Sequence, residues 1–145
     1  MRDGDVKKYS VEQLVATIIA MENLEDASTA LIHLSKKNKS LAYDLALSIL
    51  NEYKGDVFFQ AVAFEMLYSL ALPIAVEYIK YNSSKVDVYL LGVMLSSITE
   101  DSGLLEINSL IIDAVRYLQH TLLLKNPSDL EEILSIVDWF NKTYR

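Results

Sequence analysis

Hydrophobic residues recur at three- and four-residue spacings along almost the whole chain of 145 residues. This period is typical of an α-helix that buries one face, and no stretch alternates polar and apolar residues over a useful length as a half-buried strand does. Polar clusters, glycines and prolines interrupt the pattern at intervals of about one helix length. The pattern therefore predicts an all-α fold of about eight helices in antiparallel pairs.

Several of the predicted helix ends carry recognisable signals. Ser10-Val-Glu-Gln13 is a capping box that opens the first helix, and Ser128-Asp-Leu-Glu131 is a second one that opens the last. Gly55 is expected in the left-handed conformation that ends a helix, before a fourth helix over Val57 to about Leu70. Leu72–Pro73 predicts a tight corner, because proline cannot continue one helix but suits the first turn of the next.

Two features of the later helices predict packing. Gly92 lies inside a helical pattern, where it is expected to let a neighbouring element approach closely. The last helix separates its faces well. Its predicted core stripe is Leu130, Ile133, Leu134, Val137 and Phe140, and its polar face is Glu131, Ser135, Asp138 and Lys142.

The pattern predicts a flexible tail over residues 1–9 and a single helical domain over residues 10–145. The first ten residues contain two acids and no apolar core, unlike a secretory signal. The most apolar stretch, Val57 to Ile79, holds two glutamates and a proline, so a buried helical hairpin is expected and not a membrane span. The chain has no cysteine, which fits a reducing compartment, and a cytoplasmic location is expected.

The net charge of −7 is unevenly distributed. Residues 1–39 are neutral, residues 40–85 carry −2, and residues 86–145 carry nine acidic against four basic side chains, a charge of −5. Nucleic acid is not expected as a partner, because phosphate binding requires clustered lysine and arginine. An acidic surface suits a cationic protein partner, although solubility alone explains the same charge.

The sequence contains none of the residue arrangements that are typical of metal-dependent or nucleotide-binding sites. His33 and His120 have no acidic residue three or four positions away, and the four glycines are isolated, without a phosphate-binding loop. The sequence therefore predicts that the protein is not an enzyme and has no metal site and no cofactor.

Acidic and tyrosine side chains are the candidates for contact with a partner. Glu100 and Asp101 follow a predicted helix C-terminus, where negative charge opposes the helix dipole, so a docking role competes with a simple solvated turn. Tyrosine outnumbers phenylalanine by nine to four and is enriched at interfaces, although core-edge tyrosines explain the same excess. The candidate partner-binding residues are Glu100, Asp101, Glu106, Tyr78, Tyr81, Tyr89, Glu131 and Asp138.

Two resemblances add to this interpretation. The stretch from Phe59 to Ile79 resembles one HEAT-type unit, with a proline corner and an Ala-Val-x-x-Ile second helix. The expected architecture is therefore either an irregular helical bundle or a short HEAT-like array. In its build the whole chain resembles the small acidic immunity proteins of bacterial toxin–immunity systems, including contact-dependent growth inhibition. That resemblance implies an antidote that covers a toxin domain, often a basic nuclease. A HEAT-like adaptor in a larger complex is the alternative, and the oligomeric state stays open.

Overall fold

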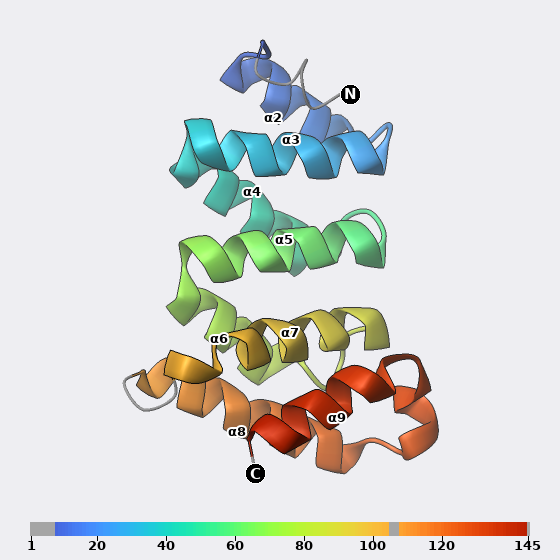
Figure 1. Cartoon of the computed structure of the whole chain (residues 1–145). Coiled ribbons are helices and arrows are strands. Elements are labelled where there is room, and N and C mark those ends of the chain that lie inside the picture. Colours follow the sequence, from blue (N-terminus) through green and yellow to red (C-terminus); the bar gives the residue numbers. More distant parts are fainter. Residues whose placement is uncertain (1–7, 105–107, 145) are drawn as a thin grey trace. The chain divides into compact units, whose positions relative to one another are not determined.

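The computed structural model describes residues 8–104 and 108–144, and this part of the chain is all-α (Figure 1). It contains eight α-helices and two short 3₁₀ segments, and none of its residues is in a strand. The predicted fold class is confirmed. The chain divides into two compact units, Met1–Leu70 and Ala71–Arg145, and the boundary directly precedes the corner predicted at Leu72–Pro73.

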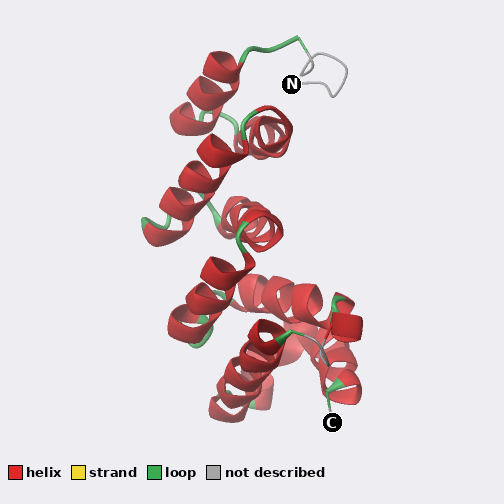
Figure 2. Cartoon of the chain, turned by 90° about the vertical axis from the view of Figure 1, so that its left-hand side faces the viewer, coloured by secondary structure: helices red, strands yellow, loops and turns green. Residues whose placement is uncertain are grey.

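The first unit is a stack of helix pairs. Its helices are α2 (Val11–Ala20), α3 (Leu24–Lys37), α4 (Lys39–Asn51) and α5 (Val57–Leu70). Helix α2 packs on α3 and α4 packs on α5, while α3 also contacts α4 and α5. Within this unit α3 and α5 lie side by side in one layer, and α2 and α4 form the other (Figures 1 and 2). This is the arrangement of a HEAT-like array.

Local capping explains where these helices begin. The Ser10 Oγ accepts from the Gln13 amide at 3.1 Å and the Gln13 side chain accepts from the Ser10 amide at 2.8 Å, so the predicted capping box is confirmed. The predicted tail is attached at its end, because Lys37 Nζ donates to the Tyr9 carbonyl oxygen at 2.5 Å. Residues 1–7 of that tail lie outside the described residues.

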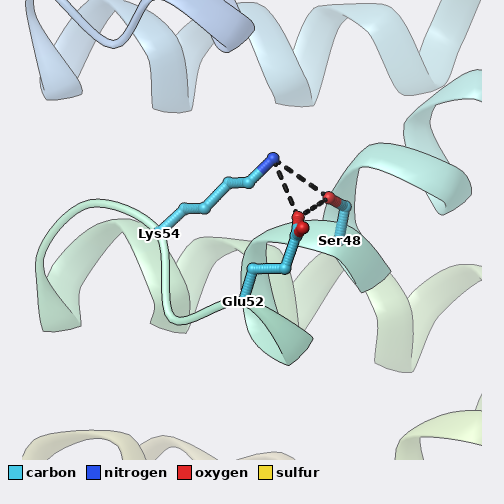
Figure 3. A network of polar contacts seen from close by, with 3 residues as sticks. All are labelled: Ser48, Glu52 and Lys54. Atoms are coloured by element: carbon cyan, nitrogen blue, oxygen red, sulfur yellow. Dashed lines mark hydrogen bonds and ion pairs between the residues drawn. The ribbon is translucent and has the colours of Figure 1, made fainter.

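The turn between α4 and α5 combines left-handed backbone with a polar network. Gly55 has φ 71°, which confirms its predicted left-handed conformation, and Tyr53 adopts φ 52° without being glycine. Lys54 Nζ lies 3.0 Å from a Glu52 carboxylate oxygen and 3.1 Å from Ser48 Oγ (Figure 3). The Ser48 hydroxyl donates to the same carboxylate at 2.6 Å. These contacts lower the pKa of Glu52 below its ordinary value, and the hydrogen bond from Ser48 has the largest effect.

The second unit contains α6 (Leu72–Asn82), α7 (Val88–Glu100), η1 (Ser102–Leu104), α8 (Ser109–Leu124), η2 (Pro127–Ile133) and α9 (Leu134–Thr143). Helices that follow one another in the chain are not the main packing partners here. Instead α6 packs on α8, and α7 packs on α9 and η2. Gly92 of α7 permits the second pairing, since a Cβ atom at Gly92 would lie 2.9 Å from Cγ2 of Ile133. The close approach predicted at Gly92 is confirmed.

Two buried polar contacts fix these pairings. Ser83, directly after α6, and Thr121 of α8 share a hydrogen bond of 2.6 Å between their hydroxyl groups. Tyr144, directly after α9, donates its hydroxyl to the carbonyl oxygen of Ile98 on α7 at 2.5 Å. Burial, and secondarily the charge of Asp101, raises the pKa of the Tyr144 hydroxyl.

The capping box predicted at Ser128 is wrong. The segment begins at Pro127 and runs as a 3₁₀ helix to Ile133 before α9 starts. The Asn126 amide donates to the Asp129 carboxylate at 3.3 Å, so the reciprocal cap lies two residues earlier than predicted. Proline suits the first helical position because its φ is fixed near the helical value, so the segment begins at Pro127, earlier than predicted.

Candidate functional site

An open groove lies between α8 and α9 in the second unit. Its volume is about 540 Å³, and η2 closes it at one end. We call it the leucine groove, because its lining residues are mainly apolar: Gln119, Leu122, Leu123, Lys125, Pro127, Leu130, Leu134, Val137 and Asn141. The groove exists because its two walls pack on different partners, α8 on α6 and α9 on α7, and make few contacts with each other.

The wall formed by α8 ends in three consecutive leucines, Leu122 to Leu124. Consecutive residues on a helix point about 100° apart, so three of them cannot all face one neighbouring helix. The buried stripe of α8 is completed by Thr121, which leaves Leu122 half-buried and Leu123 85% exposed. An apolar side chain is thus held in solvent at the edge of the groove.

The wall formed by α9 presents Leu134. The sequence pattern assigns Leu134 to the core stripe, but its side chain is 48% exposed and lines the groove. The other four residues of the predicted stripe, Leu130, Ile133, Val137 and Phe140, are buried as predicted. Leu134 differs because α9 turns its buried side toward α7 and η2, and no described element of the second unit covers the side that faces α8.

Polar contacts hold both ends of the α8 wall. Gln119 donates its side-chain amide to the Tyr144 carbonyl oxygen at 3.1 Å, which joins the two walls at the end farther from η2. At the other end, Lys125 Nζ lies 3.4 Å from the carbonyl oxygen of Ser84. The groove is therefore bounded mainly by helices, with Lys125 contributed by the short connection between α8 and η2.

The two rims of the groove carry opposite charge. On α8, Arg116 lies on the same helix face as Leu123, seven residues and two turns away, and Lys125 lines the groove directly. On the opposite wall, Glu131 and Asp138 flank Leu134 at spacings of three and four residues. Lys142 follows Asp138 by four residues on the same polar face, so these three side chains carry a net charge of −1. Arg116, Glu131 and Asp138 are all exposed.

The sequence-predicted site residues are not brought together as one site. Glu131 and Asp138 lie three and four residues from Leu134 and are not among the residues that line the leucine groove. Tyr89 and Glu100 lie near opposite ends of α7, about 16 Å apart along its axis. Glu106 lies outside the described residues.

Glu100 and Asp101 differ in surroundings although they are adjacent. Glu100 is exposed at the last position of α7. Asp101 is the half-buried C-cap, and its amide donates to the Ile98 carbonyl oxygen at 3.3 Å. That carbonyl also accepts the Tyr144 hydroxyl, so Asp101 takes part in the attachment of the C-terminal helix.

The three predicted tyrosines have separate environments. Tyr78 is buried, only 7% exposed, so the surface role predicted for it does not agree with its position. It lies on the same side of α6 as the core residue Ala75, three residues away. Tyr81 is exposed, and its ring centroid lies 5.2 Å from Lys80 Nζ. Tyr89 is exposed in the first turn of α7.

The leucines of the groove are the residues that the sequence analysis missed. The signal was the run Leu122 to Leu124 directly before Lys-Asn-Pro, since a helix that ends there cannot bury three consecutive leucines on one face. Within the described ranges, no group of three or more histidine, cysteine, aspartate or glutamate side chains is placed to hold a metal ion. Nor does any described helix combine the length and apolarity needed to cross a membrane.

Comparison with known proteins adds no relative. No protein-family model, no curated protein and no solved structure matches the chain.

Proposed function

We propose that this chain is a protein-binding domain that acts as an antidote, seating part of a toxic protein domain in the leucine groove. The observation that supports this most is the exposed position of Leu123 beside an open groove that Leu122, Leu130 and Leu134 also line. Contiguous apolar surface that is exposed on a protein and rimmed by polar residues marks an interaction site.

The acidic charge of the second half supports a cationic partner such as a nuclease domain. Residues 86–145 carry a net charge of −5, and Glu131 and Asp138 carry part of that charge three and four residues from the groove residue Leu134. Complementary potentials speed encounter and exclude wrong partners. A cytoplasmic antidote that covers a basic substrate groove would use these carboxylates in place of the phosphates of nucleic acid.

A rescue screen tests this function. Fragments of the genome that encodes the chain are expressed in a bacterial host, those that arrest growth are kept, and each is then co-expressed with the chain. We expect the wild-type chain to restore growth with at least one fragment, and the Leu123→Asp variant to fail with the same fragment. Ile19→Asp is the matched control, because Ile19 is 60% exposed on α2 of the first unit.

Two results of this screen would contradict the proposal. Either no arrested fragment is rescued by the wild-type chain, or Leu123→Asp rescues as well as the wild type does. Circular dichroism of both variants checks that they fold. Both should, since each substitution adds a charge at a side chain that already lies in solvent.

A HEAT-like adaptor is the second candidate, and one observation in the first unit favours it. A groove of about 460 Å³ runs between the stacked helices α3 and α5, with Ile32, Val62 and Met66 in its lining. Helical repeat proteins use extended surfaces of this kind to bind partners. An adaptor would lose its partner on Ile32→Asp and keep it on Leu123→Asp, whereas the antidote would show the opposite dependence.

A further inference from the structure

We propose, on the premise that the leucine groove is the docking site proposed above, that its occupant is one short amphipathic α-helix of a partner protein with oppositely charged flanks. The flank that faces α8 is acidic and the flank that faces α9 is basic. The chain would thus select its partner by the arrangement of charges as well as by an apolar face.

The size of the groove favours a single helix. Nine residues of the described chain line it, whereas a stable interface between two globular proteins uses about 20–30 residues on each side. Its apolar floor lies between two helical walls, the geometry in which a partner helix inserts side chains at positions i, i+3, i+4 and i+7. A helix of about two turns spans roughly 11 Å and presents such a set of anchors.

The charges on the two walls of the groove determine which sign of charge each flank of the partner helix carries. Arg116 lies on α8 seven residues before Leu123, and Lys125, the C-cap of α8, lines the groove two residues after Leu123. Glu131 and Asp138 flank Leu134 on the other wall. A wholly cationic helix would meet the two bases of α8, and a wholly acidic helix would meet the two carboxylates. Like charges brought together at an interface disfavour the wrong partner.

Three synthetic peptides test this occupant against the full chain. Each has about 14 residues, roughly four helical turns, and the same leucine face. One carries lysine on one flank and glutamate on the other, one carries lysine on both flanks, and one carries glutamate on both. Binding is measured by fluorescence anisotropy at about 50 mM salt, where screening is weak. We expect the mixed peptide to bind about tenfold more tightly than either single-sign peptide.

Variants of the chain connect this preference to the groove. The double substitution Glu131→Lys with Asp138→Lys makes both walls basic, so the peptide with glutamate on both flanks should become the tightest of the three. Leu123→Asp should weaken all three peptides at least tenfold. The control is Glu12→Lys with Glu25→Lys, two exposed acids of the first unit with the same total charge change, and it should keep the original order.

Equal binding of the three peptides, binding of none of them, or an order that the Glu131 and Asp138 reversal leaves unchanged would overturn the proposed occupant. Sedimentation equilibrium tests whether a second copy of the chain occupies the groove. A dimer that Leu123→Asp dissociates would show that the groove is filled by another copy, and it would overturn the proposed occupant as well. Failure of the rescue screen with the expected peptide order would instead contradict only the antidote function.

Discussion

Gly92 and Ile133 approach so closely that a Cβ atom on the glycine would lie 2.9 Å from Cγ2 of the isoleucine. This contact seats η2 against α7, and α9, which begins at the next residue, follows it onto α7. Because α8 packs on α6, the two helices that enclose the leucine groove are held by different neighbours. The missing side chain of Gly92 is thus one cause of the groove.

Gly92→Ala should destabilise the protein. In an unconstrained helix the change to alanine is favourable by about 1 kcal/mol, but here the added methyl group meets a branched side chain below van der Waals distance. Overpacking of this kind costs about 1–3 kcal/mol, so we expect a net loss of about 1 kcal/mol in the free energy of unfolding. Urea unfolding followed by circular dichroism measures it.

Gly103→Ala is the control, because a Cβ atom at Gly103 would have no atom within 4 Å. It should leave the free energy of unfolding nearly unchanged. If Gly92→Ala stabilises the protein instead, the packing of α7 on η2 is not as tight as described.

Tyr144→Phe should also lower stability. The substitution keeps the ring, which packs against Phe140 at a centroid distance of 5.2 Å, and removes only the hydroxyl that donates to Ile98. The Ile98 carbonyl keeps the Asp101 amide as a donor, so the expected loss is that of one intramolecular hydrogen bond, about 0.5–1.5 kcal/mol. Thermal unfolding measures this loss. Tyr81→Phe, at an exposed tyrosine, should have no measurable effect in the same experiment.

The same hydroxyl gives an expected pH dependence. Burial raises the pKa of Tyr144 in the folded state, so folding favours the neutral phenol. Its contribution to stability is fully present below the unfolded pKa, about 10, and is lost as the pH rises through the higher folded pKa. Wild-type stability should therefore fall more steeply above pH 10 than that of Tyr144→Phe. Parallel curves for the two proteins would be inconsistent with a buried Tyr144 hydroxyl.

Tyr53→Asn should stabilise the protein. Tyr53 is exposed and has φ 52°, a left-handed conformation that costs an ordinary residue about 1–2 kcal/mol and that asparagine tolerates better. We expect a gain of about 0.5–1 kcal/mol. The matched change Tyr81→Asn, at an exposed tyrosine within helix α6, should give no gain. A stabilisation of equal size at both positions would mean that the backbone conformation is not the cause.

Much of the fold follows from short-range signals in the sequence. Helix α5 has the predicted bounds of Val57 and Leu70, and the Ser10 cap and the Gly55 conformation also agree with prediction. Each depends on residues within a few positions of one another, so local hydrogen bonding and backbone preference are sufficient to specify it.

The candidate site depends on long-range packing and was predicted only in part. Periodicity correctly assigns Leu134 to the apolar face of its helix, but it does not tell which neighbours cover that face. The second unit pairs α6 with α8 and α7 with α9, so Leu134 and Leu123 are left beside a groove. Glu131 and Asp138 could be identified as candidates because the polar face of their helix is visible in the sequence alone.

The most direct test of the docking role is the affinity of the chain for the toxic fragment that the rescue screen identifies. Isothermal titration compares the wild type with Leu123→Asp and with Ile19→Asp. A buried leucine anchor contributes about 2 kcal/mol or more, so Leu123→Asp should weaken binding at least about 30-fold while Ile19→Asp leaves it unchanged. Equal affinity of the wild type and Leu123→Asp would contradict docking in the leucine groove.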